Sequence, residues 1–187
     1  MLGKPTIKYR LQFANHMPKG LKETSSLIEI GFSLTESAAN TFTEGRVDLQ
    51  LNPLDNEVMV VYAINLDLQS PEAIAGTDTA VLASVTRTSQ TAVQTLANSN
   101  TLGTGNKAIR AAGFVDGGVG FSSVPQETPA TAGIDYIGII ATNDFFVQVQ
   151  GIGNANASGV SGRMYCARAK ADAAVYASLV QSEVLSS

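Results

Sequence analysis

The chain has 187 residues, a mass of 19.5 kDa and a formal net charge of −4 at pH 7, with 44% hydrophobic and 15% charged residues. Globular proteins usually carry about 25% charged residues, so this chain is poor in charge and has enough apolar side chain for the core of one ordinary domain. These values argue against a disordered chain. The longest uninterrupted apolar stretch, residues 58–64, is far shorter than the roughly 20 residues that a membrane span needs.

The charge is unevenly placed along the chain. Residues 1–30 carry five basic and two acidic residues, so their net charge is +3 and that of the remainder is −7. The basic residues are Lys4, Lys8, Arg10, Lys19 and Lys22. The same thirty residues contain no apolar core of a secretory signal, so we expect no secretion by a signal peptide.

Residues 7–13 alternate strictly between apolar and polar side chains. Ile7, Tyr9, Leu11 and Phe13 fall on one face, and Lys8 and Arg10 fall on the other. This period of two predicts a half-buried strand with a basic outer face. The sequence thus divides into a basic N-terminal segment, residues 1–23, and a β-sandwich domain, residues 24–187.

Three further strands are expected in the first third of this domain. Residues 27–34 and 46–51 alternate and predict half-buried strands. Residues 52–56, rich in Asn, Pro and Asp, predict a turn. Residues 57–68 predict a long central strand, covered on both faces at its start and exposed to solvent on one face at its end.

The middle of the chain gives weaker signals. Residues 79–88 predict a strand, and residues 108–115 and 119–124 predict two more, joined by an Asp-Gly-Gly turn of hairpin character. Residues 89–106 are mostly small and polar, which fits either an irregular loop or a short helix over residues 91–97.

The last third predicts strands at 134–141, 145–152 and 163–170, and a C-terminal helix within residues 171–185. The strands 145–152 and 163–170 are expected to pair as the closing strands of the sandwich. The intervening segments read as loops, at residues 125–133 and 153–162.

Nine to ten short strands without alternating helices are typical of an all-β fold. We therefore predict a single antiparallel β-sandwich, jelly-roll-like, with a basic N-terminal segment and a short C-terminal helix. No internal repeat of fixed period suggests a solenoid or a propeller.

The residues that usually carry catalysis are almost missing. His16 is the only imidazole and lies in a polar stretch, so it is a poor candidate for a general base. Cys166 is the only cysteine and lies in the middle of an expected strand, where it behaves as a small hydrophobe. Residues 103–108 superficially resemble a phosphate loop but lack its Lys-Ser/Thr ending, and we read them as a flexible loop. We expect no catalytic site, no metal site and no cofactor.

The five basic residues of the N-terminal segment are the remaining candidates for a functional contact. Spaced lysines and arginines can contact phosphates non-specifically through counterion release. The alternation over residues 7–13 instead favours a strand that packs on this domain or on a neighbouring subunit. We favour packing over nucleic-acid contact.

An all-β chain of this size resembles the single jelly-roll coat proteins of icosahedral viruses and phages. The features that carry the resemblance are the basic start, eight or more strands, loops rich in Gly, Asn, Ser and Thr, and the scarcity of His, Cys and Trp. It covers roughly residues 6–170. The N-terminal segment is less basic than many coat arms, and some capsids of this kind enclose a membrane, so their subunits need little basic charge.

The resemblance implies a structural subunit that assembles with many copies of itself in a virion formed in the host cytoplasm. A second coat protein, weak non-specific nucleic-acid contact and inner-membrane contact are possible partners, and no small-molecule substrate is expected. Two other classes stay open: a β-sandwich module that binds carbohydrate or another ligand, and a phage tail or fibre protein.

Overall fold

The computed structural model describes residues 17–111, 119–124 and 134–185, and of residues 119–124 only the backbone. The strand expected at 7–13 lies outside these residues, as do Lys4, Lys8, Arg10 and His16. The elements are β1 (Leu21–Glu23), β2 (Ile28–Thr35), β3 (Thr43–Asp48), the 3-10 turn η1 (Pro53–Asp55), β4 (Glu57–Leu68), β5 (Thr79–Thr86), β6 (Thr101–Ala111), β7 (Val119–Val124), β8 (Gly138–Ile140), β9 (Asp144–Ile152), β10 (Gly159–Ala171) and α1 (Ala173–Leu185).

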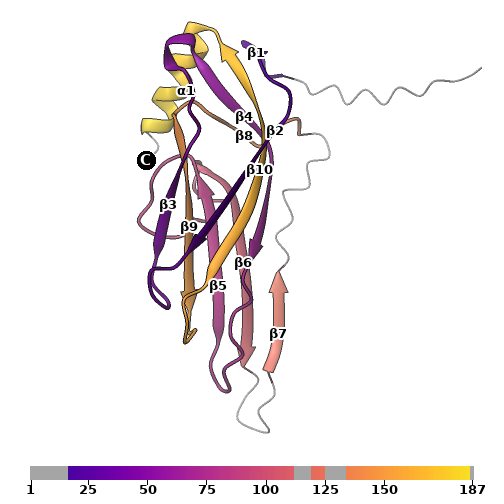
Figure 1. The fold of residues 1–187 in the computed structure, drawn as a ribbon, viewed down its shortest axis with the longest axis vertical. Helices are drawn as coiled ribbons and strands as arrows, with labels where there is room; N and C mark the ends of the chain where they lie inside the picture. The colour runs from indigo at the N-terminus through magenta and orange to yellow at the C-terminus, as the bar shows by residue number, and fades with distance from the viewer. Residues whose placement is uncertain (1–16, 112–118, 125–133, 186–187) are drawn as a thin grey trace, which may run out of the picture.

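The ten strands form two five-stranded antiparallel sheets. In sheet A, β1 and β2 pair with the same edge of β10, β10 pairs with β4, and β4 pairs with β8. In sheet B the order is β3-β9-β5-β6-β7. In each sheet, a strand from the end of the sequence lies between strands from its first half, as in a double-sheet jelly roll. Figure 1 shows the strands running along the long axis, with α1 at the end where β4 begins. The predicted fold class is confirmed.

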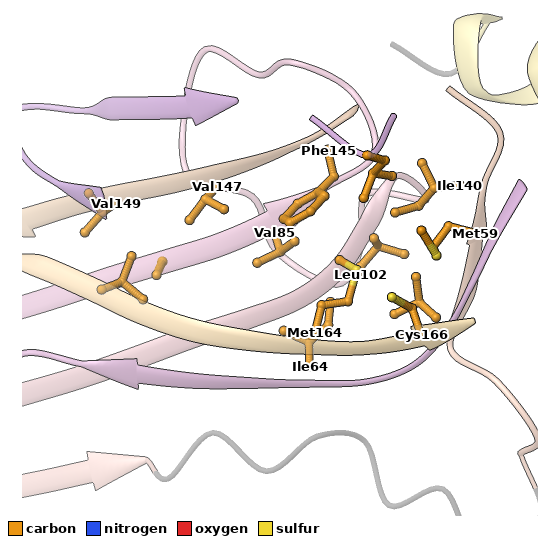
Figure 2. Close-up of a cluster of buried hydrophobic side chains, with 14 of the residues drawn as sticks. Met59, Ile64, Val85, Leu102, Ile140, Phe145, Val147, Val149, Met164 and Cys166 are labelled. Atoms are coloured by element: carbon orange, nitrogen blue, oxygen red, sulfur yellow. The ribbon is translucent and has the colours of Figure 1, made fainter. Parts of the chain in front are cut away.

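The main hydrophobic core lies between the two sheets. Val85, Phe145 and Val147 reach inward from sheet B, and Ile64 and Met164 reach inward from sheet A (Figure 2). The most completely buried of these side chains lie on β4, β5, β9 and β10, the long central strands. Burial of this continuous apolar layer is the main force that holds the sheets together.

A β-bulge in β4 corrects the predicted alternation of this strand. Consecutive residues of β10 pair with Ala63 and Val61, so Tyr62 is the extra residue. Side chains before and after a bulge exchange faces. Val60 therefore packs in a second cluster beneath α1, whereas Ile64 lies in the main core, although simple alternation predicts one face for both.

The predicted flexible loop at residues 103–108 is wrong, because β6 already begins at Thr101. Gly103 and Gly105 weaken the strand signal of the sequence. In the structure both glycines face sheet A, and a Cβ atom added at Gly105 would lie 2.5 Å from Leu68 Cδ1. The glycines make room for sheet A side chains, which single-strand patterns do not reveal.

Two other strand boundaries differ from the prediction. The strand expected at 46–51 is β3 at Thr43–Asp48, because Gln50 has a φ of +52° and turns the backbone away. The strand expected at 134–141 shortens to β8, three residues long. Leu49 and Leu51, which are buried beyond the end of β3, mimic a longer strand, whereas Ile134 before β8 is 54% exposed.

The expected pairing of the two closing strands is also wrong. β9 pairs with β3 and β5 in sheet B, whereas β10 pairs with strands of sheet A. The connection between them crosses from one sheet to the other, and β10 begins at Gly159, inside the expected loop at 153–162. Consecutive strands in a sandwich often lie in opposite sheets, and alternation alone cannot distinguish the two cases.

The expected C-terminal helix is present as α1, and it covers part of the outer face of sheet A. The Asp172 carboxylate accepts a hydrogen bond from the backbone N–H of Val175 at 2.8 Å, which caps the helix start. Tyr176, Leu179 and Val180 pack against the second cluster, beside Met17 and Leu21. We define this second cluster by its buried members, Val58, Val60, Ile139, Ala141, Ala169 and Ala171.

Candidate functional site

The structure places two of the five basic residues predicted to make contacts. Lys19 and Lys22 are exposed, and Lys22 stands opposite Lys170 in the ladder of β1 and β10. The backbone here is anchored, because Asp172 donates its N–H to the carbonyl of Gly20 at 3.1 Å. The N-terminal segment therefore reaches the sandwich beside the start of α1.

Two carboxylates are buried in the described part of the chain, and both bind backbone N–H groups. Glu36, 4% exposed, accepts hydrogen bonds from the N–H groups of Gly151 at 2.6 Å and Ser158 at 2.7 Å. It thereby ties the end of β2 to the connection between β9 and β10. Buried polar groups are normally hydrogen-bonded in this way, so Glu36 serves the fold by holding these two segments together.

Glu183, 1% exposed, is the second buried carboxylate and lies near the end of α1. It accepts hydrogen bonds from the N–H groups of Ala141 at 3.1 Å and Thr142 at 3.0 Å. Burial raises the pKa of this carboxyl group, and the bond from Ala141 and the charge of Arg87 partly offset that rise. Glu183 fastens the helix to the residues that follow β8.

A polar network lies on the outer face of sheet B, beneath the loop at residues 87–100. The Gln148 side chain, fully buried, accepts a hydrogen bond from Ser84 Oγ at 2.7 Å and donates to Glu44 Oε2 at 2.9 Å. The loop adds bonds to the same groups, since Gln90 N–H donates to Glu44 at 2.7 Å and Gln94 N–H donates to Ser84 at 2.9 Å. The network fastens the loop to the sheet, and residues 91–97 form no helix.

No local pattern of the sequence predicts this network. Glu44 and Gln148 are 104 residues apart; Gln148 lies at a polar position of the strand expected at 145–152, and Glu44 lies outside any expected strand. Their role therefore depends on tertiary contacts, including those that the loop makes with them.

Cys166 lies in the main core, as expected for a structural cysteine. Burial raises the pKa of its thiol to about 11, so the reactive thiolate is scarce at neutral pH. Among the residues that the structure describes, no group of three or more His, Cys, Asp or Glu side chains is placed to hold a metal ion. Within the described residues, no helix has the length and apolar character that crossing a membrane requires.

Two shallow hollows lie on sheet A beyond the helix. One, of about 330 Å³, is lined by residues that include Asn65, Arg163 and Tyr165, and the other, of about 270 Å³, lies next to it. They share Asp67 and Ser161. An exposed ion pair between Arg163 and Glu29, 3.1 Å long, crosses from β10 to β2 on this face.

The exposed side of α1 is a surface of a different kind. Its only charged residue, Glu183, points into the protein, so the exposed side chains carry no charge. Val184 and Leu185 at its end are 59% and 74% exposed. We call this surface the neutral face; its residues are Ala173, Ala174, Ala177, Ser178, Gln181, Ser182, Val184 and Leu185. The sequence shows that Glu183 is the one charged residue of 173–185, but it does not show which side of the helix faces outward.

The comparisons with known proteins find similarity among solved structures, at the level of the fold. No protein-family model matches the chain, and no curated protein matches it. A solved structure described as Desmodium yellow mottle tymovirus is similar over 84% of this chain and 96% of that chain, with 12% sequence identity and a TM-score of 0.32.

Proposed function

We propose that the chain is a structural subunit that assembles with copies of itself, as the coat subunit of a closed shell in a virion. The observation that carries the structural role is the use of its buried polar groups. Glu36 and Glu183 both bind backbone N–H groups, and Gln148 and Glu44 fasten a loop to sheet B. In the described residues these groups stiffen connections between strands, as a subunit that must hold its shape requires.

The surface supports the assembly role. Interface cores are depleted in charged residues, and this chain has 15% charged residues together with a helix whose exposed face is uncharged. Apolar side chains are also exposed at separate places, among them Leu54 at 92% and Leu96 at 68%. A subunit surrounded by neighbours on several sides buries such residues on assembly.

The partner in this proposal is the same chain in many copies. The proposal also includes a second coat protein, nucleic acid and an inner membrane as further partners, each contacted by the basic N-terminal segment. The proposal includes no cofactor, no catalytic site and no small-molecule substrate.

Light scattering and negative-stain images of the purified chain, across salt and protein concentration, test this proposal. Closed shells or regular multi-subunit particles are the expected result. Open tubes or fibres instead favour a tail or fibre protein, because a head-to-tail contact that does not close generates filaments. A monomer at every concentration, alone and mixed with a candidate partner coat protein, overturns the proposal.

One observation favours ligand binding as the second candidate function. Tyr165 lines the 330 Å³ hollow of sheet A beside Asn65 and Arg163, and an aromatic ring among polar groups suits the face of a sugar ring. A glycan array with the wild-type chain and Tyr165→Ala tests it. Glycan binding that Tyr165→Ala removes, in a chain that stays monomeric, favours the binding module.

A further inference from the structure

The second edge of β2 is a long strand edge that no described strand covers. β2 pairs with β10 along one edge only. It is eight residues long, whereas β1 and β8, the other strands at the sides of sheet A, have three residues each. Proteins usually shorten, charge, bulge or cover such edges, because the free backbone groups of an exposed edge pair with other chains.

β2 has little of this protection. It contains no lysine, no proline and no bulge, and Glu29 is its single charged residue. By contrast, three of the six residues of β3, at the edge of sheet B, are charged. The inward side chains of β2 pack against the main core but stay only half-buried; they are Ile28, Ile30, Phe32 and Leu34. A further strand beside β2 would cover both its backbone groups and this apolar row.

We infer that the second edge of β2 binds residues 7–13 of a second copy of the chain as an added strand, an inference that rests on the proposed function. This segment is seven residues long, contains no proline, and alternates between apolar and polar side chains. An added strand shares the two faces of the sheet that it extends. Its apolar side chains therefore continue the half-buried row of β2, and its basic side chains join Glu29 on the outer face.

The charges give the direction of the added strand. A parallel alignment sets Lys8 directly against Glu29, and it sets Ile7, Tyr9, Leu11 and Phe13 against Ile28, Ile30, Phe32 and Leu34 in that order. An antiparallel alignment of the same two apolar rows sets Gln12 against Glu29 instead. Opposite charges directly across two strands stabilise their pairing, which favours the parallel alignment. Glu29 also pairs with Arg163 on its other side, and its two carboxylate oxygens can accept from both cations.

The reach of the chain identifies the copy that supplies the strand. The parallel alignment places Phe13 beside Leu34, which pairs with Val160 of β10. Leu21 pairs with Ala171, eleven residues further along β10, or roughly 36 Å away. The eight residues from Phe13 to Leu21 span at most about 29 Å when fully extended, and the turn in which Leu21 N–H bonds to the carbonyl of Pro18 shortens them. A parallel strand on β2 therefore comes from a second copy.

The test uses cysteine pairs on the outer face, with the two cysteines in separate full-length chains. In the parallel alignment, residue 8 lies opposite residue 29 and residue 12 opposite residue 33, at a spacing that a disulfide can bridge. Lys8→Cys chains are mixed with Glu29→Cys chains, and Gln12→Cys chains with Ser33→Cys chains. Native Cys166 is fully buried and is the same in every variant. Glu29 and Ser33 are exposed, and circular dichroism melts verify that each variant folds.

The exchanged mixtures are the matched controls. They combine Lys8→Cys with Ser33→Cys, and Gln12→Cys with Glu29→Cys, so the same four variants occur in both sets. We expect the parallel mixtures to form the intermolecular disulfide at least tenfold faster than the exchanged mixtures, measured on non-reducing gels. Equal rates in the two sets overturn the inference, as does a faster reaction in the exchanged mixtures.

Double variants test whether the strand comes from the same chain. One chain carries Lys8→Cys with Glu29→Cys, and another carries Gln12→Cys with Glu29→Cys. The first should give disulfide-linked dimers and larger species, and the second should give few cross-links. A disulfide closed within one monomer, in either double variant, overturns the choice of a second copy.

Particles and cross-links scored in the same samples separate this inference from the proposed function. Selective cross-links in the parallel mixtures, at concentrations where no particles form, keep the strand contact and overturn the shell. Particles without selective cross-links keep the shell and overturn the strand contact.

Discussion

The ring of Phe32 meets the ring of Phe145 edge-on, with centroids 5.6 Å apart and an angle of 74° between the ring planes. Phe32 is on β2 at the edge of sheet A, and Phe145 is on β9 inside sheet B. This geometry aligns the positive edge of one ring with the negative face of the other. The contact joins the two sheets at a place where sheet A contributes its edge strand, β2.

Phe145→Ala should lower the free energy of unfolding by about 3–5 kcal/mol, because it removes a fully buried ring and leaves a cavity between the sheets. Urea denaturation measures the change. The control, Leu54→Ala, alters a side chain that is 92% exposed and should change stability by less than about 0.5 kcal/mol. A loss below about 1 kcal/mol for Phe145→Ala contradicts the described core.

Glu36→Ala should cost about 2–4 kcal/mol, since it leaves the buried N–H groups of Gly151 and Ser158 without their acceptor. The comparison is Glu29→Ala, which removes an exposed ion pair with Arg163 and should have a much smaller effect. Urea denaturation measures the loss of unfolding free energy for each variant. Equal losses contradict the hydrogen bonds between Glu36 and the connection of β9 and β10.

Gly153→Ala should destabilise the fold by more than about 1 kcal/mol. Gly153 has a φ of +67°, and a Cβ atom there would lie 2.5 Å from the backbone oxygen of Asp78. Gly31→Ala is the matched control, because nothing lies within 4 Å of a Cβ atom at Gly31. Thermal melts that show the same change for both alanine variants contradict the turn geometry at Gly153.

The pH dependence of stability should contain a contribution from Glu183. Burial raises the pKa of its carboxyl group in the folded chain above the ordinary value of 4.5. The folded state therefore holds this proton more tightly than the unfolded state, so the contribution to stability is complete below pH 4.5 and is lost as the pH rises through the folded pKa.

Glu183→Gln removes this titration and keeps a side-chain oxygen for the N–H groups of Ala141 and Thr142. We expect wild type to lose stability relative to Glu183→Gln as the pH rises from 4.5 toward neutrality, measured by urea midpoints at one-unit steps. Other carboxyl groups cancel in this difference. A flat difference across the range refutes the raised pKa.

The N-terminal segment gives the last prediction. Removal of residues 1–16 should weaken assembly and leave a cooperative β-type melt if the strand expected at residues 7–13 packs on a neighbouring subunit. Removal of residues 1–23 should also lower the melting temperature, since it deletes the ladder of β1 with β10 and the packing of Met17 and Leu21. A non-cooperative melt after removal of residues 1–16 contradicts the proposed division of the chain.

Charge reversal distinguishes the two roles of the same segment. Reversal of Lys4, Lys8 and Arg10 to glutamate should remove any nucleic acid that copurifies with wild type. The measurement is the ratio of the absorbance at the nucleic-acid maximum to the absorbance at the protein maximum. An unchanged ratio leaves packing as the role of the segment.

The sequence predicts the class of fold well because each half-buried strand shows an alternation of apolar and polar side chains in consecutive residues. The predicted bounds of β2 and β4 agree with the structure to within one residue, and the start of β4 is covered on both faces as predicted. The pattern fails where a strand depends on its neighbours. β6 contains Gly103 and Gly105 because sheet A approaches closely there, and the bulge at Tyr62 arises from the pairing with β10.

The candidate surfaces were less predictable than the fold. Lys19 and Lys22 are exposed, as their charge suggests, but their place beside α1 follows from the pairing of β1 with β10. The neutral face depends on which side of α1 packs on the second cluster, and residues 173–185 have mixed three- and four-residue spacings that do not fix that side. The polar network under the loop 87–100 requires contacts across more than sixty residues, which local patterns do not encode.

The position of β10 has a consequence for the order in which the chain folds. β10 is the inner strand against which β1, β2 and β4 all align, yet it follows all three of them in the chain. β9 has the same relation to β3 and β5. The earlier strands therefore keep unpaired edges until β9 and β10 have been synthesised, and this high contact order implies slow folding and exposure to aggregation. Newly made chains should therefore depend on chaperones until residue 171 has emerged.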